Sequence, residues 1–146
     1  MSLQEWSEDR LIESQPTSKN EIAGLLEKID QHLIDANVEV ISLDLRLTTA
    51  YSACLKCATI ALRACGYRVP SGTGQHYLTI ESLKFTIKHK SEAILFFHSI
   101  RKKRGQVSYD ATATTTKIEV KDAINFANEL KEIILIWLKE NHPGLL

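Results

Sequence analysis

The stretch SLDLRLTTAYSACLKCATIALRACG, residues 42–66, has the pattern of one long helix. Its apolar and small residues recur every three or four positions, which places them on one helical face. Ser42 stands where an N-cap belongs and Gly66 where a left-handed C-terminal cap belongs. The stripe consists of Leu43, Leu47, Ala50, Tyr51, Cys54, Ala58, Ala61, Leu62 and Cys65. Because alanine and cysteine dominate its second half, we predict that another helix packs closely there.

The three cysteines of the chain, Cys54, Cys57 and Cys65, all lie in this stretch. Cys54 and Cys57 form a C-x-x-C pair, a spacing used in redox and zinc sites, but no second C-x-x-C or histidine pair accompanies it at zinc spacing. Free cysteine on an apolar helical face behaves as a small hydrophobe. We therefore predict core cysteines, with no metal and no cofactor.

One helix is predicted before this stretch. Ser18 is a candidate N-cap, and Glu21, three residues later, completes the pattern of a capping box. The apolar face then continues through Ile22, Leu25, Leu26, Ile29 and Leu33. Residues 1–17 are polar and read as an N-terminal extension, and residues 18–146 read as a single domain.

Three further helices are predicted after it, following a Gly-, Ser- and Pro-rich loop at residues 67–76. They are a shorter helix from Thr79, a helix from Ser91 that frays between Gly105 and Tyr109, and, after an extended connector, a last helix from Val120 to Asn141. No segment reads as a convincing strand. The predicted fold is all-α, an antiparallel up-and-down bundle of four long helices plus one shorter helix.

Composition limits the possible partners. The chain has 146 residues, of which 44% are hydrophobic and 25% charged, as expected of one compact domain. Eighteen basic residues balance eighteen acidic ones, so no overall field attracts nucleic acid or an anionic membrane, and any phosphate binding must be local. The first residues lack the pattern of a signal peptide and no apolar run has the length of a membrane span, so we expect a cytoplasmic protein without membrane contact.

The stretch RKKRGQVSYD, residues 101–110, places charge on an apolar stripe. Arg101 and Arg104, three positions apart, continue the line of Ile94 and Phe97. A guanidinium stays charged and needs a carboxylate, a carbonyl or a phosphate as its acceptor. Within the chain, the candidate carboxylates are Asp44 and Asp110.

Several short motifs occur in an order that resembles the HEPN-domain superfamily, over about residues 40–145. They are Ala50-Tyr51-Ser52-Ala53, the run Ala61 to Arg68 around Gly66, Gly74-Gln75-His76, the R-x-x-R-x-x-x-x-Y-D motif at 101–110, and the tail Trp137 to Leu145. The resemblance implies a helical bundle that often forms a homodimer with two arginine motifs facing one cleft. It also implies a link to metal-independent ribonucleases with R-x(4-6)-H, some of them toxins paired with a minimal nucleotidyltransferase.

The catalytic half of that motif differs here. Arg104 matches the family's arginine, but Tyr109 stands in the place of the histidine and Gly105 replaces the usual polar residue. Histidine titrates near pH 6.5 and suits proton transfer to and from RNA, whereas tyrosine titrates near 10. Arginines can still bind phosphate and stabilise developing charge. The resemblance therefore implies binding of RNA or phosphate more readily than cleavage of RNA.

The predicted site combines the arginine motif with the two histidines nearest to it. Its members are Arg101, Lys102, Arg104, Tyr109, Asp110, His76 and His98, with Arg104 and Tyr109 as the catalytic pair if the protein is an enzyme. Tyr109 has two interpretations, as a packing residue over the end of the bundle or as a hydroxyl offered to RNA.

Three functional hypotheses follow. The first is a homodimeric HEPN-like domain that binds RNA or nucleotide phosphate, as part of a toxin–antitoxin or nucleotidyltransferase-associated system. The second is a metal-independent ribonuclease toxin in which Tyr109 or His98 replaces the missing histidine. The third is a structural interaction bundle in which Asp44 and Asp110 neutralise the arginines.

Overall fold

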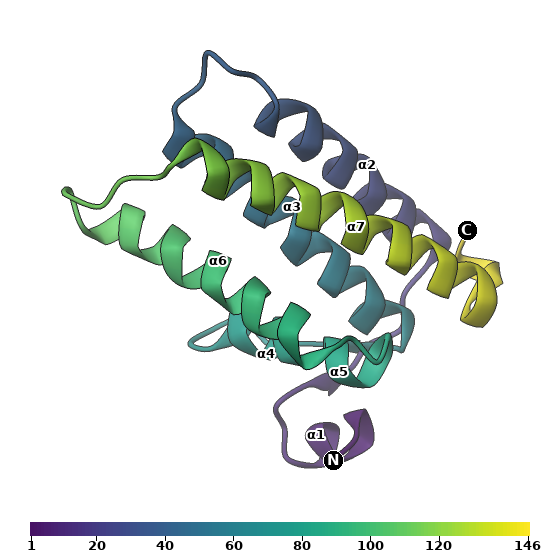
Figure 1. Ribbon diagram of the computed structural model, residues 1–146. Helices are drawn as coiled ribbons and strands as arrows, with labels where there is room; N and C mark the ends of the chain where they lie inside the picture. Colours follow the sequence, from purple (N-terminus) through teal and green to yellow (C-terminus); the bar gives the residue numbers. More distant parts are fainter.

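The computed structural model describes residues 1–146 and is built on four long helices (Figure 1). These are α2 (Lys19–Ala36), α3 (Leu43–Ala64), α6 (Ser91–Tyr109) and α7 (Lys117–Asn141). Consecutive long helices run in opposite directions along the molecule. The short elements are α1 (Leu3–Glu8), β1 (Glu13–Ser14), β2 (Tyr67–Arg68), α4 (Gln75–Glu81), α5 (Leu83–Thr86) and the 3-10 helix η1 (Pro143–Leu145). The predicted all-α class is confirmed. None of the helices is both long and apolar enough to cross a bilayer.

Helix α3 is the central element, because α2, α6, α7 and α4 all pack against it. Its small residues, among them Ala50, Ala58 and Ala61, are fully buried, which lets the neighbouring backbones approach closely. Cys54 and Cys57 are also fully buried and form no disulfide, and burial raises the pKa of Cys57 to about 12. These two cysteines are core residues, as predicted, whereas Cys65, at the C-cap of α3, is only partly buried and lies outside the core.

Helix boundaries follow the capping signals at several points. The side chains of Ser18 and Ser42 accept hydrogen bonds from the backbone N–H of Glu21 (3.1 Å) and Leu45 (3.2 Å), and Gly66 has a φ of +88°. The capping box predicted at Ser18 is wrong, because the Glu21 carboxylate accepts from the Thr17 hydroxyl and from a distant arginine instead.

A complete capping box does occur at the start of α7, where Thr116 and Glu119 exchange hydrogen bonds. The helix therefore begins at Lys117, three residues before the predicted Val120. Because each partner supplies an acceptor to the other's backbone N–H, the box fixes the first turn. The apolar pattern alone, which starts at Val120, misses this polar turn.

Two other predicted boundaries are wrong. Helix α4 begins at Gln75, after Gly74 in a left-handed conformation, and Thr79 lies inside it with its hydroxyl donating to the Gln75 carbonyl (2.8 Å). Helix α6 does not fray at Gly105 but continues to Tyr109. Glycine destabilises a helix interior by only about 1 kcal/mol relative to alanine, and the helical turns on both sides of Gly105 compensate for this cost.

The N-terminal segment packs onto the bundle. Trp6 and Ile12 are buried against Leu62 and Val69 in a small second core. Strand β1 pairs antiparallel with β2, a two-residue pairing that the sequence did not predict. Arg63, on α3, is buried and holds the junction between this segment and the bundle. It donates to the Glu21 carboxylate (2.8 Å) and to the carbonyls of Gln15, Pro16 and Tyr67.

Candidate functional site

Arg101 and Arg104 lie on the side of α6 that faces α4, where they line a groove of about 350 Å³. The opposite wall is the loop that leads into α4. The residues that line the groove are Gly72, Gly74, Gln75, His76, Tyr77, Arg101, Arg104 and Gly105. Gly72 and Gly74 have φ values of +140° and +83°, which glycine adopts without strain. The loop therefore turns tightly, and its backbone rather than bulky side chains borders the groove.

Arg104 is half-buried and has no carboxylate partner. Its guanidinium carbon lies 5.9 Å from the centroid of the Tyr51 ring, a cation–π arrangement. Its Nε is buried and makes no hydrogen bond within the chain. An unsatisfied buried donor is destabilising by about 1–3 kcal/mol, and no acceptor within the chain offsets this cost for the Arg104 guanidinium.

Arg101 is positioned by a hydrogen-bonded series of side chains that runs through His98 to Glu81. Its Nε donates to Nδ1 of His98 (3.2 Å), and Nε2 of His98 lies 2.8 Å from the Glu81 carboxylate. His98 is buried and its ring stacks on Tyr77 at 5.0 Å, while the Arg101 guanidinium lies 5.7 Å from the same Tyr77 ring. This arrangement orients Arg101 towards the groove.

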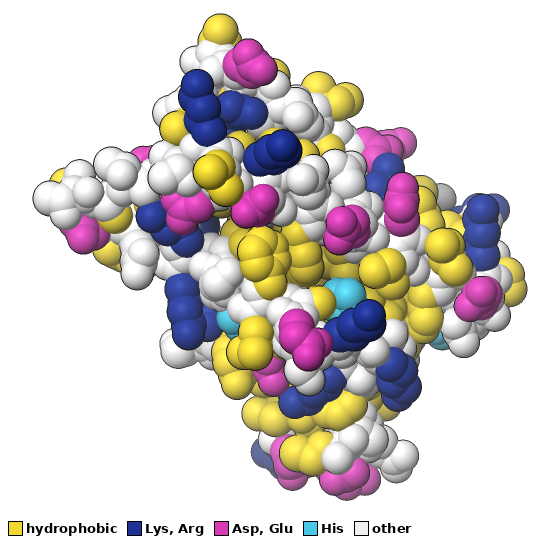
Figure 2. All heavy atoms as spheres, viewed as in Figure 1, with side chains coloured by type: hydrophobic (Ala, Val, Ile, Leu, Met, Phe, Trp, Pro, Cys, Tyr) yellow, Lys and Arg dark blue, Asp and Glu magenta, His cyan; other side chains and the backbone are white.

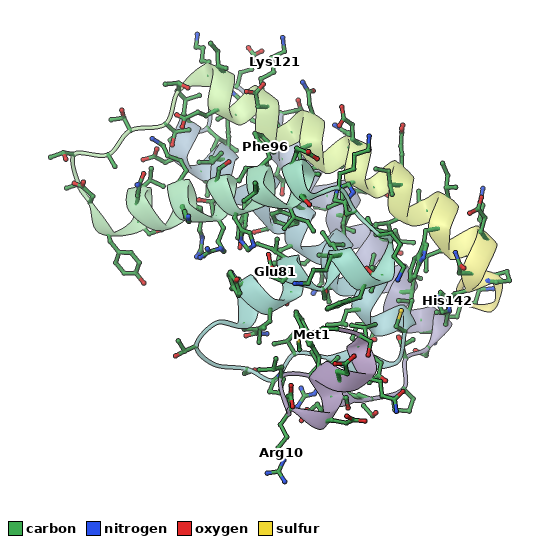
Figure 3. All side chains as sticks on the ribbon, turned by 60° about the horizontal axis from the view of Figure 1, so that its bottom comes forward. Met1, Arg10, Glu81, Phe96, Lys121 and His142 are labelled. Carbon is green, nitrogen blue, oxygen red and sulfur yellow. The ribbon has the colours of Figure 1, made fainter.

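Glu81 reaches from α4 to complete this chain (Figure 3). Burial alone would raise the pKa of Glu81, but hydrogen bonds from His98 and Lys84 outweigh it and the pKa lies below its ordinary value. The carboxylate is therefore ionised at neutral pH. It is engaged by His98 and Lys84, so it does not neutralise Arg101 or Arg104 directly.

His76 is the histidine that lines the groove. Its Nδ1 lies 3.1 Å from the hydroxyl of Tyr51. Burial, followed by the charges of Arg104 and Arg101, lowers the pKa of His76. Burial raises the pKa of Tyr51 to about 12, against the opposing effect of the same two arginines. At neutral pH the pair is therefore an uncharged imidazole and an uncharged phenol beside two guanidinium groups.

The two aspartates predicted to neutralise the arginines do not do so. Asp44 accepts a hydrogen bond from the Thr115 hydroxyl (2.6 Å). Asp110 is exposed and accepts from the backbone N–H and the hydroxyl of Thr112. That part of the third hypothesis is wrong. The positive charge of the groove is consequently not cancelled by these carboxylates.

Part of the predicted site lies elsewhere. Lys102 is exposed outside the groove, and Lys103 pairs with Glu119 (3.5 Å). The Tyr109 side chain is 92% exposed, so the interpretation that it packs over the end of the bundle is wrong. Five residues along a helix correspond to a rotation of about 140°, which directs Tyr109 away from the groove that Arg104 lines.

Of the residues assigned to the site from the sequence, the structure places Arg101, Arg104 and His76 at one groove and His98 against Arg101, and it adds four neighbours. Tyr77 and Gln75 line the groove, Tyr51 contacts His76, and Glu81 anchors His98. In the sequence, Tyr51 belongs only to an apolar stripe and to the A-Y-x-A motif. The G-x-H loop was the one signal that pointed to this wall of the groove.

No family model, no curated protein and no solved structure matches the chain. Fold and geometry define it as an all-α protein with an arginine-lined groove between α4 and α6.

Proposed function

We propose that the protein is a HEPN-like helical domain that binds RNA or nucleotide phosphate in the groove between α4 and α6. The observation that carries this proposal is the pair Arg101 and Arg104, which converge on one groove without a carboxylate partner. Phosphate oxygens supply charged acceptors and match the planar fork of a guanidinium. The Arg104 side chain lines the groove and its guanidinium has no acceptor within the chain, so such an acceptor can complete its hydrogen bonding.

The remaining walls of the groove support the same ligand. Gly72 and Gly74 leave room for a close approach to the loop backbone, and His76 adds a ring nitrogen beside the arginines. Since the chain has no net charge, this local cluster is the source of attraction rather than the whole molecule. A homodimer that brings two such grooves together, and association with a minimal nucleotidyltransferase, follow from the family resemblance and belong to the same proposal.

Fluorescence anisotropy with a labelled single-stranded RNA tests this function. We expect Arg104→Ala and Arg101→Ala each to weaken binding by about tenfold, the loss typical of one charge-assisted hydrogen bond. Lys102→Ala is the matched control, because it removes a charge from the same run outside the groove, and we expect less than about a twofold change. Equal losses in all three variants would show binding by general charge and contradict the assigned site.

A second candidate is metal-independent RNA cleavage, which one observation favours. His76 lies in the groove beside both arginines, and its lowered pKa leaves it neutral and able to exchange a proton near neutral pH. Arg101 and Arg104 would stabilise the charge that develops on the phosphate. His98 is less suited to this role, because both of its ring nitrogens are already engaged.

The cleavage assay uses the same RNA in the presence of a chelator. Cleavage that disappears in His76→Ala and Arg104→Ala but persists in Tyr109→Phe would assign the reaction to the groove. Binding without cleavage by the unmodified protein would leave the first function and exclude the second for that RNA.

A further inference from the structure

A second groove, of about 490 Å³, lies between α6 and α7. Both helices pack on α3, and here they meet one another through side chains, chiefly Phe96 and Phe97 of α6 against Phe126 of α7. Its floor is apolar and consists of Ala93, Phe96, Phe126, Leu130 and Ile133. Phe96 meets Phe126 edge to face with ring centroids 5.2 Å apart, yet 37% of Phe96 and 39% of Ile133 remain exposed. Figure 3 shows Phe96 on α6, on the side of α7.

Carboxylates surround this apolar floor. Glu92 comes from α6, and Asp122 and Glu129 come from α7. All three are exposed, and none forms an ion pair or a side-chain hydrogen bond within the chain. Figure 2 shows hydrophobic side chains gathered in the middle of this face with acidic side chains beside them. In a chain without net charge, this rim is a local acidic feature.

The one histidine at the groove does not offset this charge. His89 also lines the groove, and burial together with the nearby Lys90 lowers its pKa. It is therefore neutral at neutral pH. An apolar floor with unpaired carboxylates at its border is complementary to an apolar stripe flanked by cations.

We propose that the groove between α6 and α7 docks an amphipathic helix of a partner protein, with an apolar stripe flanked by Lys or Arg. Phe126 and Leu130 are buried and close the bottom of the groove, whereas Phe96 on α6 and Ile133 on α7 are exposed on its two sides and offer apolar surface to a docked helix. From Asp122 to Ile133 the wall is about 16 Å long, which corresponds to three turns of a docked helix.

Charge excludes two other occupants. A second copy docked by two-fold symmetry would bring the same acidic rim against itself. RNA would meet carboxylates rather than donors. The groove also lies on the N-terminal half of α6 towards α7, whereas Arg101 and Arg104 lie on the C-terminal half towards α4. The docking site is therefore independent of the proposed RNA-binding function.

The test selects peptides of about 16 residues, long enough for four helical turns, from a randomised display library on the full chain. We expect enriched sequences with apolar residues at i, i+3 or i+4 and i+7, flanked by Lys or Arg. In anisotropy titrations with the best peptide, the double variant Asp122→Lys, Glu129→Lys should lose about tenfold in affinity. Glu140→Lys, an exposed charge reversal on α7 beyond the groove, is the matched control and should change the affinity for the peptide less than about twofold.

Three results would overturn the proposal. The enriched peptides could be acidic. Alternatively, the double variant could bind the best peptide as tightly as the unmodified protein does, while unfolding at the same temperature as the Glu140→Lys control. Light scattering could also show a dimer that the double variant converts to a monomer, which would make a second copy the occupant.

Discussion

The Nε–H of Arg101 donates a hydrogen bond to Nδ1 of His98 across 3.2 Å. An imidazole nitrogen accepts only when it carries no proton, so the proton of His98 belongs on Nε2, which lies 2.8 Å from Glu81. The imidazole thus links a carboxylate on α4 to a guanidinium on α6. His98 positions Arg101 rather than contacting a ligand itself.

The tautomer of His98 is the first testable consequence. We expect the proton on Nε2 and none on Nδ1, because only this tautomer donates to Glu81 and accepts from Arg101. Long-range ¹H–¹⁵N spectra distinguish an unprotonated from a protonated ring nitrogen. A protonated Nδ1 on His98 would contradict the link to Arg101.

RNA affinity should depend on pH through His76. In the free protein its pKa is lowered, so it is neutral at pH 7, and a bound phosphate would raise that pKa. The complex therefore binds the proton more tightly than the free protein, and affinity should rise as the pH falls from about 7.5 to 5.5. Phosphodiesters do not titrate in this range. His76→Gln should flatten the profile, and an unchanged slope would place the titrating group elsewhere.

Arg63 should contribute strongly to stability. Its replacement by Met removes the ion pair to Glu21 and leaves the carbonyls of Gln15, Pro16 and Tyr67 without their donor. We expect the free energy of unfolding to fall by about 3 kcal/mol. Arg68→Met, which removes the half-exposed pair with Glu13, is the control and should lower it by less than about 1 kcal/mol. Denaturant titrations that give similar losses would show that the buried network does not anchor the N-terminal segment.

Tyr109 should be dispensable for folding and for RNA binding. Its side chain is 92% exposed and lies outside the arginine groove. We expect Tyr109→Ala to change the free energy of unfolding by less than about 0.5 kcal/mol and RNA affinity by less than about twofold. A large loss of affinity for the same labelled RNA would contradict this prediction and show that Tyr109 contributes to RNA binding.

Much of the fold follows from local patterns. Ser42 and Gly66 marked the ends of α3, and its small residues foretold close packing, because capping and helical periodicity act over a few residues. The start of α4 was missed because Gly74 caps it with no side-chain signal, and Thr79 resembled a cap although its hydroxyl bonds back to Gln75. The β1–β2 pair is too short to show a strand pattern.

The part of the site that depends on residues close together in the sequence was predictable, as the helix ends were. Arg101 and Arg104 share a helical face at i, i+3, so their convergence is local. The contact of Tyr51 with His76 joins residues 25 positions apart, and that of Glu81 with His98 joins residues 17 apart. Such pairs depend on how α3, α4 and α6 pack together. The sequence alone offered Asp44 and Asp110 as partners, and tertiary packing directs both of them elsewhere.

The most direct test of the central claim follows the arginine Nε–H resonances while single-stranded RNA is added. We expect the signals of Arg101 and Arg104 to shift, because these side chains line the groove and the Nε of Arg104 lacks a partner. The signals of Arg46 and Arg63 serve as internal controls and should stay, since neither side chain lines this groove and both donate within the chain, to the Ala36 carbonyl and to Glu21. RNA that binds without moving the Arg104 signal, or that moves all four equally, would contradict the assignment of the groove between α4 and α6 as the phosphate site.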